Sequence, residues 1–142
     1  TVDQIKLIAR YTQNITVLYD GDTAGIKASI RGIDMILQEG LNVRIVLFPD
    51  GDDPDSYSKK VSTEELKLFL TDSARDFILF KTELLLSEAG NDPLRKAALI
   101  KDIVESISKI PDAIIRATYT KQCAIAMEID EQVLLIELNK LR

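Results

Sequence analysis

The sequence contains no histidine, no tryptophan and only one cysteine, Cys123. Without histidine the chain lacks the commonest general base and metal ligand of enzymes, which excludes a Ser-His-Asp or Cys-His active site. A single cysteine excludes an internal disulfide and a zinc site built from several thiolates. Cys123 lies in an apolar helical pattern beside Ala124 and Met127, so we expect it to be buried and assign it no chemical role.

Long apolar runs are also absent. No stretch approaches the roughly 20 residues needed to cross a bilayer, and the N-terminus lacks the charged-then-apolar layout of a signal peptide. The 142 residues suffice to bury the core of one domain or slightly more. The chain starts at Thr1 rather than at methionine, and its first expected helix has little before it to pack against. We therefore expect the chain to be a piece of a longer protein.

The net charge of −5 argues against a nucleic-acid partner, but the distribution of the charges changes that interpretation. Residues 1–60 carry seven Lys/Arg and nine Asp/Glu. Six of these nine acidic residues fall into two short clusters: Asp20, Asp22, Asp50, Asp52, Asp53 and Asp55. If bound metal ions neutralised the clusters, the segment would become basic.

The first third of the chain has the pattern of an α/β fold. Apolar spacing predicts, in order, a helix, a strand, a helix and a strand: Val2–Tyr11, Ile15–Tyr19, Ala24–Gln38 and Val43–Phe48. A strand, a helix and a further strand of these lengths form the right-handed crossover of a parallel sheet. The β-branched and aromatic first strand is expected to be buried on both faces, and its missing neighbours are expected to precede Thr1.

The pattern changes after Tyr57, because residues 62–142 contain no convincing strand. The expected helices are Thr63–Leu70, Ala74–Glu88, Pro93–Ser108, Asp112–Met127 and Glu131–Leu141. The sequence therefore predicts two parts, an α/β part over residues 1–60 and an all-α helical bundle over residues 61–142.

The two acidic clusters follow the two expected strands, at the edge where open α/β sheets bind their ligands. Asp20 and Asp22 are two residues apart, so both carboxylates can face one cation. In the second cluster Pro54 restricts the backbone between Asp53 and Asp55. Carboxylates without imidazole or thiolate select Mg²⁺, Mn²⁺ or Ca²⁺ rather than zinc. Asp-Gly and Asp-Pro pairs are also ordinary turn residues, so a purely structural role stays open.

The stretches "YDGDTAG" and "LFPDGDDPDSY" resemble the Toprim domain of bacterial DnaG-type DNA primases. The resemblance covers nearly the whole chain: residues 1–60 are similar to the later part of the Toprim core, and residues 61–142 to the helical subdomain that follows it. It implies Mg²⁺ or Mn²⁺ as the cofactor, and Asp20 and Asp22 as catalytic residues. The implied metal ligands are Asp20, Asp22, Asp53 and Asp55. Gly21 and Gly25 match the glycines of the motif, whereas Asp50 and Asp52 are not assigned to the metal.

In the intact protein the resemblance implies a nucleotidyltransferase that synthesises short RNA primers on single-stranded DNA. A ribonucleotide 3′-hydroxyl would attack the α-phosphate of an incoming NTP and release pyrophosphate. The implied partners are the template, NTPs, the RNA primer and a replicative helicase bound through a domain absent here, with no membrane. The implied location is the replication fork in the bacterial cytoplasm. The family's upstream glutamate, in an "EG..D" element, has no match in this chain, so we expect an incomplete site and no priming by the chain alone.

Two other functions stay open at this point. One is a fragment of a Toprim-type nuclease or topoisomerase that uses the same acidic site. The other is a non-enzymatic docking module, with the acidic loops serving only as turns. We expect four basic residues near the clusters to be solvated rather than to contact phosphate: Lys27, Arg31, Lys59 and Lys60. Five aromatic residues are expected to be core rather than base-stacking platforms: Tyr57, Phe69, Phe77, Phe80 and Tyr119.

Overall fold

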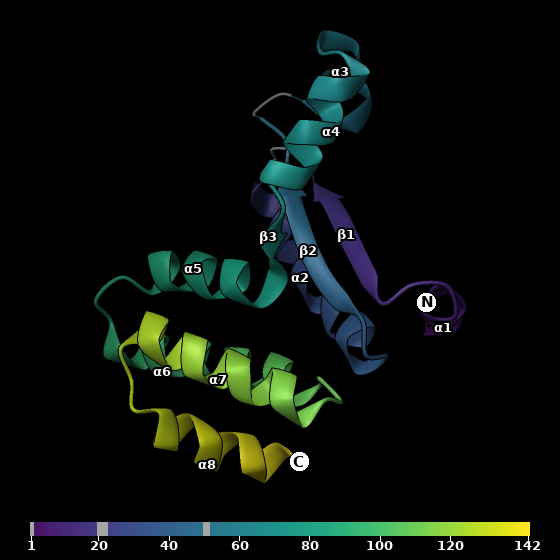
Figure 1. The fold of residues 1–142 in the computed structure, drawn as a ribbon. Helices are drawn as coiled ribbons and strands as arrows, with labels where there is room; N and C mark the ends of the chain where they lie inside the picture. Colours follow the sequence, from purple (N-terminus) through teal and green to yellow (C-terminus); the bar gives the residue numbers. More distant parts are fainter. Residues whose placement is uncertain (1, 20–22, 50–51) are drawn as a thin grey trace.

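The computed structural model describes residues 2–19, 23–49 and 52–142. Its elements are α1 (Val2–Ala9), β1 (Asn14–Tyr19), α2 (Thr23–Gln38), β2 (Asn42–Leu47), α3 (Pro54–Lys60), α4 (Thr63–Asp72), β3 (Arg75–Asp76), α5 (Phe77–Ala89), α6 (Pro93–Ser108), α7 (Ala113–Met127) and α8 (Glu131–Leu141). Figure 1 shows a small central sheet, with α3 and α4 beyond one end of it and α5 to α8 stacked on one side. The predicted α/β part followed by a helical part is confirmed.

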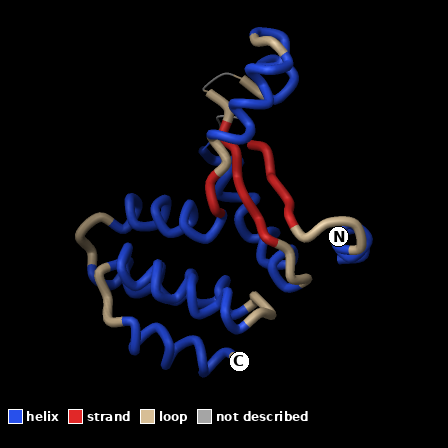
Figure 2. Tube along the Cα trace, in the orientation of Figure 1, coloured by secondary structure: helices blue, strands red, loops and turns tan. Residues whose placement is uncertain are grey.

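The sheet has three strands in the order β1-β2-β3. β1 and β2 are parallel and in register from Asn14 opposite Asn42 to Tyr19 opposite Leu47, which confirms the predicted crossover. β3 is antiparallel to β2, and Figure 2 shows it as a short red segment between α4 and α5. The expectation of no strand after residue 62 is therefore wrong. Two residues are too few to show the alternation by which a strand is recognised, so the apolar pattern does not indicate β3.

The expected burial of the first strand on both faces is also wrong. Along β1 the side chains alternate between exposed and half-buried, and Leu18 is 41% exposed. In the described sheet β1 is an edge strand that pairs with β2 alone, so its apolar residues have less cover. In the central strand β2, by contrast, Ile45 and Val46 point to opposite faces and both have no exposed surface.

One hydrophobic core runs from the sheet through the helical part. Phe77 and Phe80 of α5 belong to it, as expected, and so does Cys123 of α7, which has no exposed surface. Burial raises the pKa of the Cys123 thiol, as is usual for a cysteine in apolar surroundings. Members of the core come from α2, β2, α5, α6, α7 and α8. The division at residue 60 stays a prediction, since the core joins the two sides.

Asp76 connects the sheet to the helical part. It is the last residue of β3, and its backbone pairs with Arg44 of β2. Its carboxylate also caps α5, since Oδ2 accepts a hydrogen bond from Leu79 N at 3.0 Å, which explains why α5 starts three residues later than predicted. The other oxygen accepts the hydroxyl of Tyr119 from α7. Burial and this carboxylate together raise the pKa of Tyr119 well above its usual range, and the ring is half-buried.

The ends of the other helices follow ordinary capping chemistry. Helices α6 and α8 have their predicted bounds, with Asp92 and Asp130 as N-caps. Helix α7 ends at Met127, and its C-cap Glu128 adopts the left-handed conformation with φ of 53°. Among the helices in the described ranges, none combines the length and the apolarity needed to span a membrane.

Candidate metal centre

The parallel strands β1 and β2 finish side by side at one edge of the sheet (Figure 1). The pairing continues past β2, because Phe48 N donates to the carbonyl oxygen of Tyr19 at 3.0 Å. The segments that follow the two strands therefore start from the same edge. Of the predicted site residues, Asp20 and Asp22 lie outside the described residues, as do Gly21 and Asp50. Their convergence with the second cluster stays a prediction, and Gly25 lies in α2.

Asp53 is the N-cap of α3, a helix that the sequence analysis did not predict. Its Oδ1 accepts a hydrogen bond from Ser56 N at 2.7 Å, and its own N–H donates to Ser56 Oγ at 3.0 Å. This reciprocal pair is a capping box, and Pro54 occupies the first turn, where proline is favoured. The hydrogen bonds from Ser56 lower the pKa of Asp53. The predicted metal ligand Asp53 is thus already held in a defined position by the start of α3.

Asp52 is the buried carboxylate of the cluster, and sequence reasoning left it unassigned. It is 7% exposed, and its Oδ1 accepts hydrogen bonds from Lys60 Nζ at 2.8 Å and from Ser56 Oγ at 3.0 Å. Lys60 is the largest cause of a lowered Asp52 pKa, which Ser56 lowers further and burial opposes. Ser56 and Lys60 lie four residues apart within α3 and so on one side of that helix, whereas Asp52 precedes the N-cap Asp53. The fold of the chain before α3 therefore brings Asp52 to Lys60, and no spacing in the sequence indicates this ion pair.

Asp55 is exposed and forms an ion pair with Lys59, four residues on, at 3.2 Å. Such pairs at the surface contribute little to stability, and a competing ligand can replace them at small cost. Lys59 and Lys60 are both mostly exposed, as predicted, yet each of them pairs with a carboxylate of the cluster. The side chains of Lys27 and Arg31 lie outside the described part of the structure.

Three aromatic rings fix α3 and α4 against the end of β2. The ring of Phe48 lies 5.5 Å from that of Tyr57 and 5.4 Å from that of Phe69, and the last two are 4.7 Å apart, measured between centroids. Offset and edge-on contacts at these separations are favourable. The rings pack on one another, but Tyr57 and Phe69 are only half-buried and do not belong to the main hydrophobic core, so the predicted core role is wrong for these two residues. Tyr57 belongs to α3, so this cluster also positions the capped residue Asp53 at the sheet edge.

The donor chemistry at this edge suits a hard cation. Asp52, Asp53 and Asp55 supply carboxylate oxygens, which Mg²⁺ and Mn²⁺ prefer. Over residues 2–19, 23–49 and 52–142, however, no three acidic or thiol side chains lie close enough to hold a metal ion together. A complete set of metal ligands therefore requires residues from outside the described ranges. The predicted pair Asp20 and Asp22 directly follows β1, which ends at this edge.

Replacing Lys60 with methionine is expected to raise the pKa of Asp52, because the ammonium that lowers it most is gone while burial remains. A carboxyl group whose pKa is lower in the folded than in the unfolded protein stabilises the fold at pH values above its unfolded-state pKa. This contribution disappears as the pH falls through the folded-state pKa. The stability difference between the two proteins should therefore be present at neutral pH and vanish in acid.

Carbon-detected NMR titration of the side-chain carboxyl measures the midpoint of Asp52 in each protein. Lys59→Met is the matched control, since Lys59 pairs with Asp55 instead. An unchanged midpoint in Lys60→Met would show that the ion pair does not form in solution.

Two family profiles match the chain. The profile described as Toprim-like matches residues 1–58, and the profile described as DnaB-helicase binding domain of primase matches residues 80–132. The second match lies inside the helical part. It differs from the expectation that helicase binding depends on a domain absent from this chain.

Known primases are similar to nearly the whole chain. A DNA primase of Staphylococcus epidermidis is 30% identical over 137 residues, which are 96% of this chain and 23% of the relative. The primase catalytic core of Escherichia coli is 27% identical, with a TM-score of 0.79 over 92% of this chain and 42% of that one. A DnaG primase catalytic domain bound to single-stranded DNA is 26% identical, with a TM-score of 0.76 over 88% and 41%. The chain thus spans less than a quarter of the curated relative's length.

Proposed function

Because the chain belongs to the bacterial DnaG-type DNA primase family, we propose that it forms part of the nucleotidyl-transfer site of a primase. In the intact protein this site joins ribonucleotides into short RNA primers on single-stranded DNA. The observation that supports the assignment most directly is the in-register parallel pairing of β1 with β2, which starts both acidic segments at one sheet edge.

In this proposal Asp20 and Asp22 are catalytic residues, and together with Asp53 and Asp55 they hold the metal ions directly or through water. Mg²⁺ or Mn²⁺ held by these residues would supply positive charge that neutralises the triphosphate and lowers the pKa of the attacking hydroxyl. The capping box fixes Asp53, so the carboxylate needs little reorganisation on binding. Lys60 holds Asp52 in its charged form at the same edge. The chain needs no histidine for this chemistry.

The remaining assignments extend the same proposal. The template is single-stranded DNA, to which a related catalytic domain is bound in its own structure. The substrates are NTPs and the growing primer, and the reaction takes place at the replication fork in the bacterial cytoplasm. Residues 1–60 complete the Toprim domain and residues 61–142 form the helical subdomain. The match over residues 80–132 suggests that the helical subdomain also contacts the replicative helicase. Both parts of the chain are similar to primases, whereas only the Toprim-like part would fit a nuclease or topoisomerase. The comparison therefore favours the primase function.

Paramagnetic broadening by Mn²⁺ tests the metal site in this chain itself. Backbone amide NMR signals of residues 20–25 and 50–57 are expected to broaden, and the Asp20→Asn, Asp22→Asn variant should lose that effect. A variant with the same charge change on α1 and α8, Asp3→Asn with Glu137→Gln, is the control and should keep it. Broadening spread over all acidic residues, or unchanged in the Asp20→Asn, Asp22→Asn variant, would contradict a single converged site. No broadening at all would mean that this chain lacks a ligand needed for affinity, and a longer chain that includes the upstream glutamate would then repeat the test.

A further inference from the structure

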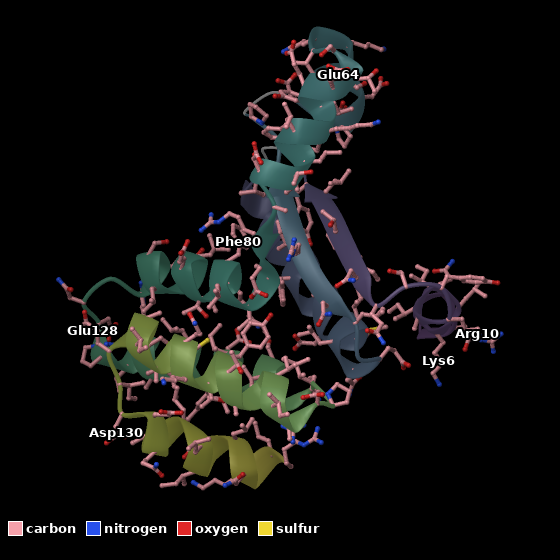
Figure 3. All side chains as sticks on the ribbon, in the orientation of Figure 1. Lys6, Arg10, Glu64, Phe80, Glu128 and Asp130 are labelled. Atoms are coloured by element: carbon pink, nitrogen blue, oxygen red, sulfur yellow. The ribbon has the colours of Figure 1, made fainter. Side chains whose placement is uncertain are left out.

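Helix α3 carries two of the proposed metal ligands, although little of the fold supports it. Asp53 is its N-cap, and Asp55 lies in its first turn. The helix is seven residues long, and none of its residues is buried. Figure 3 shows α3 with α4 beyond the end of the sheet, away from the stacked helices α5 to α8. Because isolated helices shorter than about 12 residues are marginal in water, the direction of α3 depends on local contacts.

One ion pair joins the two ends of α3. Lys60 is the last residue of the helix, and Asp52 lies directly before the N-cap. Lys60 Nζ is 2.8 Å from Asp52 Oδ1, and the Asp52 side chain is 8% exposed against 64% for Lys60. The backbone N–H of Asp52 also donates to the carbonyl oxygen of Pro49 at 2.9 Å, in the segment that follows β2. Asp52 is therefore held near the end of the sheet, and Lys60 connects the far end of α3 to it.

Ser56 connects this ion pair to the proposed ligand Asp53. Its Oγ donates to Asp52 Oδ1 at 3.0 Å, and its backbone N–H donates to Asp53 Oδ1 at 2.7 Å. A movement of Asp52 would thus reach the carboxylate of Asp53 through one serine. Hydrogen-bond partners that orient metal ligands are often needed for full metal affinity.

Lys59 offers a comparison within the same helix. It carries the same charge as Lys60 and pairs with Asp55 at 3.2 Å, but the side chains of that pair are 75% and 78% exposed. Removing a positive charge near a cation site favours binding of the cation. Charge alone therefore predicts tighter metal binding when either lysine is removed, whereas a loss of position predicts weaker binding only when Lys60 is removed.

We propose that Asp52 and Lys60 are positioning residues of the metal site, and that their ion pair holds α3 in the direction that brings Asp53 and Asp55 to the metal. This inference rests on the proposed function, because it takes both of these aspartates as metal ligands. Asp52 and Lys60 act through α3 rather than by contact with the metal. Their ion pair adds to the capping box and to the packing of Tyr57 in fixing the helix.

The dissociation constant for Mn²⁺, measured by the broadening of the amide signals of residues 52–57, tests the inference. Lys60→Met is expected to bind Mn²⁺ about tenfold more weakly than the unmodified chain, although it has lost a positive charge. Lys59→Met should bind at least as tightly as the unmodified chain, and Lys60→Arg, which keeps the ion pair, should restore most of the affinity. Where this chain alone does not bind Mn²⁺, the longer chain with the upstream glutamate is measured with the same substitutions.

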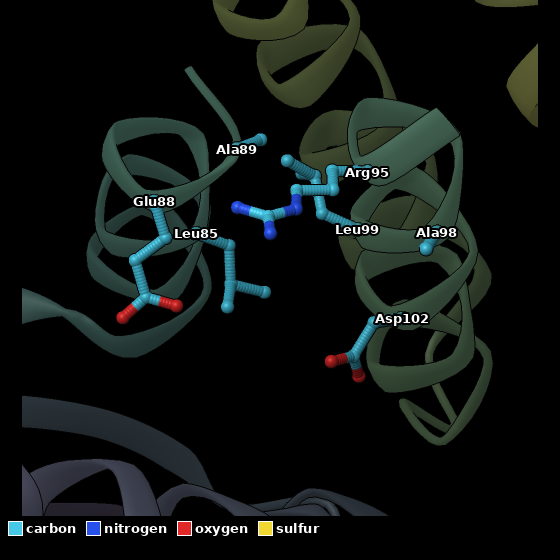
Figure 4. A pocket seen from close by; sticks show the side chains of 7 residues that line it. All are labelled: Leu85, Glu88, Ala89, Arg95, Ala98, Leu99 and Asp102. Atoms are coloured by element: carbon cyan, nitrogen blue, oxygen red, sulfur yellow. The ribbon is translucent and has the colours of Figure 1, made fainter. Parts of the chain in front are cut away.

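Hydrogen exchange of the Ser56 amide supplies a second readout, which needs no metal. This N–H donates to Asp53 and is protected by that bond. It should lose protection in Lys60→Met and keep it in Lys59→Met. The control for stability is Leu85→Ala, which enlarges the pocket of ≈ 370 Å³ between α5 and α6 (Figure 4). It should change neither the Mn²⁺ affinity nor the exchange of the Ser56 amide.

The outcomes separate the two proposals. If the unmodified protein binds Mn²⁺ and Lys60→Met binds it equally well or more tightly, the ion pair does not position the site, although the metal site stands. If Leu85→Ala weakens binding as much as Lys60→Met does, a general loss of stability explains the effect, and the inference is again wrong. Weaker binding with unchanged Ser56 protection would show that Lys60 does not act through α3. If the unmodified protein binds no Mn²⁺ in either length of chain, the metal site and its positioning both fail.

Discussion

Replacing Asp102 with alanine is expected to destabilise the protein by about 3 kcal/mol, the lower end of the cost of leaving a buried charge unpaired. Asp102 is the acidic partner of Lys81, and the Lys81 side chain is only 4% exposed. Without Asp102 the ammonium would keep its hydrogen bond to Ser106 Oγ at 2.7 Å, but no other ion pair among the described residues would balance its charge. Ser106 is a neutral partner, and it offsets only part of the desolvation of the ammonium.

Removing the other partner of the ion pair, Lys81, should cost far less stability. Lys81→Met removes the charge together with the need to balance it, and the long apolar side chain fills a similar volume. Asp102, which is 49% exposed, would turn to water. We expect a loss within about 1 kcal/mol. Urea unfolding of the two variants measures the difference. Equal losses in both would show that the pair acts as an ordinary surface ion pair and that Lys81 is hydrated in solution.

Replacing Phe77 with alanine is expected to cost about 4 kcal/mol, as for other aromatic residues truncated in a core. Phe77 has no exposed surface and belongs to the same hydrophobic cluster as Ile45 of β2 and Ile103 of α6. Phe77 therefore stabilises the packing of the helical part against the sheet. Since domains of this size have only about 5–15 kcal/mol of stability in total, the variant should be close to unfolding at physiological temperature.

Phe77→Leu is the matched control, because it keeps much of the apolar volume and should lose no more than about 1.5 kcal/mol. Unfolding followed by circular dichroism and by tyrosine fluorescence should give one coincident transition in each protein, since the core is continuous. Two separate transitions, with only one of them shifted by Phe77→Ala, would instead show that residues 1–60 and 61–142 fold independently.

The sequence predicted those features of the fold that depend on long, regular patterns. The crossover from β1 through α2 to β2 and the bounds of α6 and α8 could be read from apolar spacing and capping residues. The two-residue strand β3 could not, because its pairing with β2 depends on where α4 returns the chain. The exposure of β1 depends on how many strands flank it. The residues of a single strand do not show whether it lies at the edge or in the middle of a sheet, so this exposure could not be predicted.

The candidate site shows the same limit at the level of single residues. The acidic clusters at the ends of two parallel strands were predicted from the pattern, and the resemblance assigned four of their members to metal. The pair of buried Asp52 with exposed Lys60 was missed, because the Asp-Pro sequence suggested a turn, whereas the structure has a capped helix from Pro54. Asp52 lies just before that helix, so helical spacing alone does not indicate its contact with Lys60.

The three contacts of Asp76 hold the start of helix α5 in a fixed position. Helix α5 starts there and runs for 13 residues, about 20 Å at 1.5 Å per residue. A rotation of about 6° at the base would therefore move the far end of α5 by about 2 Å. Strand pairing, the helix cap and the Tyr119 hydroxyl all oppose such a rotation. The direction of α5 is consequently fixed relative to β2, so the distance from the acidic sheet edge to the far end of the helix stays constant.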